Sequence, residues 1–209
     1  MNPVHVAQYL VNRFGGVPGG ITPLKVQKLL YYVKAWDVTG GPGGLVGGPF
    51  MKWPHGPVNP GVYHHFKDRG RSPLQPVDLG AFEPTGEARA FVDFIGASYA
   101  RFPAVSLSVM THQEDPWRLT ADGAVISVDR MRAFYGERHP FRVNLPFDPA
   151  NEYRPVGSDL GKAFTMDLAP DDEARATTFA TFGAYLAQVD RLQQMGMARS
   201  DGVLSRLLT

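Results

Sequence analysis

The stretch Thr22-Pro23-Leu24-Lys25-Val26-Gln27-Lys28-Leu29-Leu30-Tyr31-Tyr32-Val33-Lys34-Ala35-Trp36 decides how the rest of the chain is arranged. Thr22 can cap a helix, because its hydroxyl accepts a free amide of the first turn, and Pro23 suits the first helical position. Apolar residues recur three and four positions apart, at Val26, Leu29, Leu30 and Val33, which is the period of one helix face. The helix must end near residue 40, because the glycine-rich run 40–44 cannot continue it. A helix this apolar usually has neighbours on more than one side, so we expect it inside the domain.

The composition describes one globular domain, or one domain with an appendage. The chain has 209 residues, of which 44% are hydrophobic and 20% charged, enough to bury a core. The formal net charge of +1 argues against a large nucleic-acid footprint, so we assign Lys25, Lys28 and Lys34 to a solvated helix face. The absence of cysteine excludes disulfides, thiolate catalysis and cysteine-ligated zinc. The N-terminus lacks a signal-peptide pattern and no apolar run is long enough to cross a membrane, so we expect a cytoplasmic protein.

Glycine and proline divide the first two thirds of the chain into short helices. The apolar spacing predicts helices over residues 3–14, 60–70, 85–99, 103–111 and 127–136. Residues 50–53 and 125–126 have the character of extended segments. We expect turns at residues 55–60, where each proline restricts its predecessor, and at 112–117.

The last third of the chain has a different sequence pattern, with frequent prolines and little helical periodicity. Prolines stand at 140, 146, 149, 155 and 170, and few helical patterns lie between them, so residues 137–170 are expected to form an irregular arm. A last helix is expected after Pro170, because its acidic start suits the positive end of a helix dipole. Residues spaced three and four apart form a narrow seam that resembles a coiled-coil stripe: Phe179, Phe182, Leu186, Val189 and Gln193.

The predicted fold is therefore mainly α. It consists of a compact helical domain with short extended segments, a Pro-rich arm and a C-terminal helix. We divide the chain into a helical core, residues 1–137, and an arm with its helix, residues 138–209, packed on the same domain.

Residue chemistry alone shows no catalytic machinery. His55, His65, His112 and Glu114 could in principle meet at a metal, but no HxxxH or HExxH pair exists, and no Gly-x-Ser-x-Gly elbow is present. Glu114 and Asp115 are paired carboxylates that could act in acid–base catalysis, although we favour a turn held by carboxylate-to-amide bonds. We therefore predict no catalytic residue, no metal site and no cofactor.

Four stretches together resemble one known family. They are TPLKVQKLLYY at 22–32, FMKWPHGPVNPGVY at 50–63, SLSVMTHQEDPW at 106–117 and ISVDRMRAFY at 126–135. In this order and at these separations they are similar to the Panacea domain, the SocA-like antitoxin family of bacteria and their phages. The resemblance covers about residues 4–137.

The resemblance implies a mainly α-helical fold and an antitoxin that neutralises a toxin encoded next to it. Direct protein–protein binding is the usual expectation, whereas one branch of the family hands its toxin to an ATP-dependent protease. An enzyme that reverses a toxin's modification is a third, less favoured alternative. The family brings no established catalytic residues. A homodimer is compatible with the sequence, and neither a membrane nor nucleic acid is expected as a partner.

We expect partner contacts in two regions. Aromatic and histidine side chains in the matching stretches supply one set, because tryptophan in particular is favoured at protein interfaces: Trp53, His55, Tyr63, His112 and Trp117. The arm and last helix supply Phe147, Tyr153 and Phe182, and we expect specificity for one toxin to come from this part. Truncation after Gly136 should then abolish neutralisation and leave a folded core.

Overall fold

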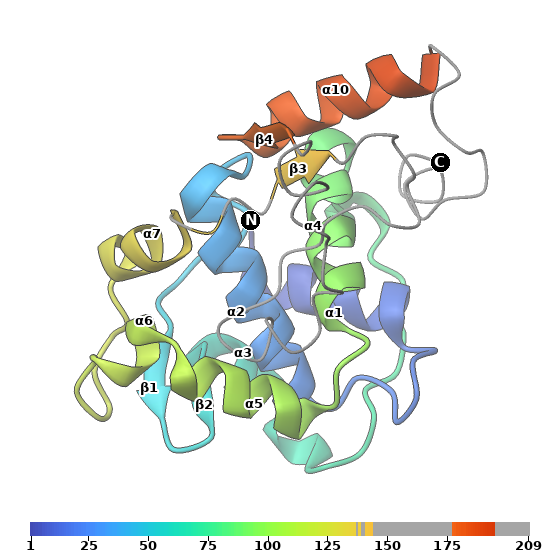
Figure 1. The fold of residues 1–209 in the computed structure, drawn as a ribbon. Coiled ribbons are helices and arrows are strands. Elements are labelled where there is room, and N and C mark those ends of the chain that lie inside the picture. The colour runs from blue at the N-terminus through green and yellow to red at the C-terminus, as the bar shows by residue number, and fades with distance from the viewer. Residues whose placement is uncertain (137, 139–140, 144–176, 195–209) are drawn as a thin grey trace.

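The computed structural model describes residues 1–136, 138, 141–143 and 177–194 (Figure 1). Over these residues the fold is mainly α, as predicted, with short strands. The helices are α1 Pro3–Phe14, α2 Pro23–Gly40, α3 Pro60–Phe66, α4 Gly86–Tyr99, α5 Ala104–Gln113, α6 Asp115–Arg118, α7 Val128–Gly136 and α10 Phe182–Gln194, with single turns of 3-10 helix at Lys67–Arg69 and Gly80–Phe82. No helix in the described ranges is both long and apolar enough to cross a lipid bilayer.

Helix α2 is the centre of the fold. Thr22 caps it by accepting the Lys25 amide at 3.3 Å, and the Gly41 amide closes its other end on the carbonyls of Trp36 and Asp37. It contacts α1, α4, α5 and α7, which surround it in Figure 1. The predicted start, end and central position of this helix are confirmed.

The lysines of α2 do not form the solvated face that we expected. Lys25 and Lys28 are 3% and 0% exposed, and Lys34 donates to the carbonyl of Val46 at 2.9 Å. The physical reason is that a helix with neighbours on several sides has little face left for solvent.

A small hairpin lies against α2 and α5. Strand β1 Met51–Trp53 pairs antiparallel with β2 Gly56–Val58, with Trp53 opposite Gly56 and Met51 opposite Val58. Our prediction of a turn over 55–60 is therefore wrong for residues 56–58, because the turn is limited to Pro54 and His55. The extended character of residues 50–53 and 125–126 is confirmed. The two segments lie side by side, and the amide of Ile126 donates to the carbonyl of Phe50 at 2.8 Å.

A short helix replaces the turn that we predicted at residues 112–117. Helix α5 continues to Gln113, Glu114 takes an extended conformation at φ −84° and ψ 135°, and α6 begins at Asp115. Pro116 lies in the first turn of α6, where a proline needs no amide hydrogen. The proline thus starts a helix rather than excluding one.

The C-terminal helix begins later than its seam suggested. Strand β4 Thr177–Phe179 pairs antiparallel with β3 Phe141–Val143, and α10 starts only at Phe182. Two threonines followed by a phenylalanine favour a strand over a helix. Phe182 and Tyr185 are 1% and 0% exposed, and the Phe182 ring packs on Phe91 and Phe94 of α4 at centroid distances of 5.0 and 5.4 Å. Most of the predicted arm lies outside the described residues.

Candidate functional site

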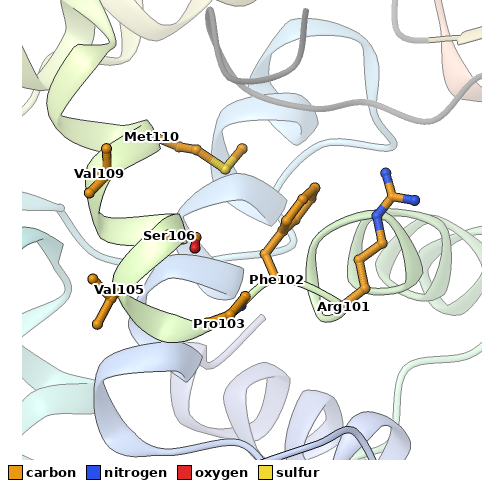
Figure 2. A pocket seen from close by; sticks show the side chains of 7 residues that line it. All are labelled: Arg101, Phe102, Pro103, Val105, Ser106, Val109 and Met110. Atoms are coloured by element: carbon orange, nitrogen blue, oxygen red, sulfur yellow. The ribbon is translucent and has the colours of Figure 1, made fainter. Parts of the chain in front are cut away.

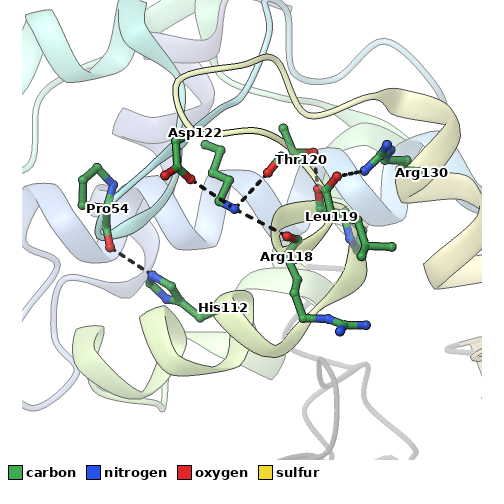
Figure 3. Close-up of polar contacts among 9 residues, drawn as sticks. Pro54, His112, Arg118, Leu119, Thr120, Asp122 and Arg130 are labelled. Carbon is green, nitrogen blue, oxygen red and sulfur yellow. Dashed lines mark hydrogen bonds and ion pairs between the residues drawn. The ribbon is translucent and has the colours of Figure 1, made fainter.

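The structure brings together five of the side chains that we expected to contact a partner. We call this group the hairpin surface: Trp53, His55, Tyr63, His112 and Trp117. The Trp53 ring packs edge-on against Tyr63 of α3 at 4.9 Å between centroids. The His112 ring packs on Trp117 at 4.0 Å, and its Nε2 lies 3.0 Å from the carbonyl oxygen of Pro54 (Figure 3). These contacts form two ring pairs, Trp53 with Tyr63 and His112 with Trp117, and His112 links the second pair to the hairpin turn that carries His55.

Several members of the hairpin surface are open to solvent. His55 is exposed and Tyr63 is 40% exposed, whereas Trp53, His112 and Trp117 are half-buried. The half-buried rings are held in place by packing when no partner is bound. Together with the exposed rings they still present apolar surface that a partner protein can cover. The cluster therefore has the composition of a protein-binding surface.

Lys52 of β1 links the hairpin to residues 120–122, which follow α6. Its ammonium donates to the carbonyl of Thr120 at 2.9 Å and pairs with Asp122 at 3.2 Å (Figure 3). The same ammonium lies 4.4 Å from the centre of the Trp117 ring. Because one cation meets a carbonyl, a carboxylate and an aromatic ring, it is committed to the fold. It is not available as a free charge for an acidic ligand.

Side chains of α2 and α5 hold the turn of the hairpin and the strand that follows it. The Ser108 hydroxyl donates to the carbonyl of His55 at 2.9 Å, and the Lys28 ammonium donates to the carbonyl of Pro57 at 2.9 Å. Between them Gly56 has a φ of +98°, and a Cβ on it would lie 2.7 Å from Lys28 Nζ. Burial lowers the pKa of Lys28 to about 7.

Lys28 was missed as a site residue, although the sequence held a signal. We predicted that α2 has neighbours on several sides, and that prediction already implies that its lysines face protein rather than water. The hydrogen bond to a backbone carbonyl has no sequence signature of its own.

Glu114 does not form the carboxylate-to-amide turn that we favoured. Its side chain is fully buried and accepts hydrogen bonds from the phenols of Tyr32 at 3.0 Å and Tyr135 at 2.5 Å. Burial raises the pKa of Glu114 to about 8, although the two phenols oppose that shift. The carboxyl thus links α2, the α5–α6 junction and α7 inside the core.

The histidine–glutamate metal cluster that we weighed as an alternative does not assemble in the part of the chain that the structure describes. Among the residues that the structure describes, no three His, Cys, Asp or Glu side chains are placed to hold one metal ion. His55 and His65 are exposed, while Glu114 is buried.

The remaining expected contacts fall elsewhere. Phe182 is in the core, so its side chain is not available to a partner in this conformation. Phe147 and Tyr153 lie outside the described residues.

An apolar hollow of about 600 Å³ lies where α4 leads into α5 (Figure 2). Phe102, Val105, Val109 and Met110 line it, with Arg101 at its edge. Val105 and Val109 are 68% and 44% exposed. Helix α5 thus borders this hollow with one side and holds the hairpin turn with Ser108 and His112.

Comparison with protein families matches residues 26–118 to the family described as antitoxin SocA-like, Panacea domain. The match confirms the resemblance over these residues, which run from within α2 to the end of α6 and include the whole hairpin surface. The match supports an antitoxin role in general, with a toxin as partner. No curated protein and no solved structure gives a significant match to the chain.

Proposed function

We propose that this chain neutralises its toxin by binding it directly through the hairpin surface, in the cytoplasm and without a catalytic step. The observation that supports this mechanism most is that two partly exposed ring pairs, Trp53 with Tyr63 and His112 with Trp117, lie at the hairpin whose turn carries the exposed His55. The members of the hairpin surface come from separate elements and none of them is fully buried.

The chemistry of the cluster suits a protein partner. Tryptophan and tyrosine carry much of the binding energy at protein interfaces, because they bury large area at a low cost in side-chain entropy. The cluster has no free cation at its centre, because Lys52 is paired within the fold. Recognition would then depend on shape and apolar contact more than on charge.

The arm is assigned a second part in recognition. We propose that residues 138–209 supply specificity for one toxin, with Phe147 and Tyr153 as contacts. An extended segment can wrap a partner at the cost of being ordered on binding. The shared helical core would then be a scaffold that presents the hairpin surface.

The test is co-expression with the protein encoded next to this chain, which should be toxic when induced alone. The double substitution His55→Asp and Tyr63→Asp places charge on two exposed side chains and should weaken the complex more than tenfold. The matched control is Phe82→Asp, since Phe82 is an aromatic residue 59% exposed and outside the hairpin surface. Thermal unfolding of each variant checks that the fold is kept.

Relief of toxicity with a stable complex, lost in the double variant and kept in the control, supports direct binding at this surface. Equal binding by both variants would remove the hairpin surface from the mechanism. If relief requires the cell's ATP-dependent proteases and the neighbour's level falls, the chain is an adaptor instead. Relief with neither a complex nor a loss of the neighbour would indicate an enzyme.

A further inference from the structure

The exposed turn of the hairpin and the buried strand β2 that follows it are held by three side chains from two helices. Lys28 of α2 and Ser108 of α5 donate to the carbonyls of Pro57 and His55, each at 2.9 Å. His112 of α5 brings Nε2 to within 3.0 Å of the carbonyl of Pro54. Side chains of α2 and α5 thus contact three of the four backbone carbonyls of residues 54–57.

The contacts of Ser108 and His112 are not needed to satisfy the turn, whereas the Lys28 bond satisfies the carbonyl of the buried Pro57. Pro54 and His55 are exposed, so water could donate hydrogen bonds to their carbonyls instead. The core gains little from them either, because a fully buried lysine costs desolvation that an apolar side chain of similar size would not. A fixed conformation of the turn is the one result that all three contacts share.

We propose that Lys28, Ser108 and His112 act as a clamp that holds residues 53–57 in their binding conformation before the toxin arrives. This role rests on the proposed function, since it concerns the same hairpin surface. A loop that is already ordered loses less entropy on binding, and the apparent affinity rises with the fraction of molecules in the competent conformation. Lys28 and Ser108 are therefore positioning residues for the turn, whereas His112 both holds the turn and belongs to the hairpin surface.

Ser108 is the residue to test, because its side chain is half-buried and lies at the rim of the core. Ser108→Ala removes the donor to His55. Ser106→Ala makes the same chemical change on the same helix, at a half-buried serine that lines the hollow instead of holding the turn. Ser108→Thr restores a hydroxyl at the original position.

Two measurements are made on the full chain. Hydrogen exchange at the amides of His55 and Gly56, recorded without any partner, reports the order of the turn. Association and dissociation rates with the neighbouring-gene protein report binding. We expect Ser108→Ala to speed exchange and to weaken binding about five- to tenfold, mainly through slower association. Ser106→Ala and Ser108→Thr should behave like the parent chain in both measurements.

Unchanged affinity in Ser108→Ala overturns the clamp, whether or not exchange at the turn increases. Weaker binding with unchanged exchange overturns it too, because Ser108 would then act as a direct contact. Failure of the proposed function is separate, since it shows as retained binding in the His55→Asp and Tyr63→Asp double variant. The exchange measurement needs no toxin and stands in either case.

Discussion

Lys28 and Glu114 place ionisable groups in the core at positions where apolar side chains would fit the surrounding pattern. Each is 0% exposed, and each is bonded to a different element of the fold. Lys28 reaches the hairpin through Pro57, while Glu114 joins Tyr32 of α2 to Tyr135 of α7. Polar bonds of this kind are directional, so they fix the relative position of elements more sharply than apolar contact does.

Gly56 is the residue on which the fit between Lys28 and the hairpin depends. Gly56→Ala would require a φ near +98° from an alanine and place Cβ 2.7 Å from Lys28 Nζ and 2.8 Å from Thr111 Oγ1. We expect the free energy of unfolding to fall by about 3 kcal/mol, measured by urea denaturation. The matched control is Gly43→Ala, where φ is +87° but no atom lies within 4 Å of the new Cβ. It should cost about 1 kcal/mol, the price of the backbone conformation alone. Equal losses in the two variants would contradict a close contact at Gly56.

Glu114 should make stability depend on pH. Its folded pKa of about 8 lies above its ordinary value of 4.5, so the folded state keeps a proton that the unfolded chain releases. The contribution of Glu114 to stability is therefore fully present below pH 4.5 and is lost as pH rises towards 8. We expect the parent chain to lose a few kcal/mol more than Glu114→Gln across this window. Urea denaturation at several pH values measures the difference, and identical pH slopes in the two proteins would show that Glu114 is ionised in the fold.

At the scale of the element, local signals in the sequence were sufficient for most of the helices. Thr22 and Pro23 start α2, Gly41 ends it, and Pro60 starts α3 as predicted. Each of these signals acts within one turn of backbone, so it is readable without knowing the partner elements.

The elements that were missed depend on contacts across the chain. Gly56 and Pro57 are turn-forming residues by composition, yet they pair with β1, and Lys28 and Ser108 bond to this strand and its turn from distant parts of the chain. Strand β4 forms opposite β3, more than thirty residues earlier in the sequence. A single sequence carries no signal for such pairings.

The candidate site shows the same division. Its five residues were chosen from the sequence as expected partner contacts, which stays a prediction, whereas their placement around the hairpin required the structure. The contact between His112 and Pro54 spans fifty-eight residues of chain and ends on a backbone carbonyl. The role of Ser108 in holding the turn was not predicted, because the sequence around it does not distinguish it from other serines on a helix.

At the scale of the whole molecule, α10 belongs to the same buried cluster as α2 and α4. Phe182 and Tyr185 close the outer side of Phe91 and Phe94. Truncation after Gly136 would therefore uncover large aromatic side chains of α4. Our expectation that such a truncation leaves a folded core does not fit this packing, and a loss of neutralisation after truncation would not isolate the arm.

A point substitution separates the packing of α10 from the function of the arm. Phe182→Ala leaves every other residue in place and creates a cavity beside Phe91 and Phe94, so we expect the full chain to lose about 3 kcal/mol of unfolding free energy. Ala184→Ser, on the exposed side of the same helix, should change it by less than about 0.5 kcal/mol. Urea denaturation of both variants gives the comparison.

If Phe182→Ala is as stable as the parent chain, α10 does not contribute to the core, and truncation after Gly136 becomes a clean test of the arm. If the loss is found, toxin specificity has to be tested in the full chain, with substitutions at Phe147 and Tyr153 that leave α10 in place.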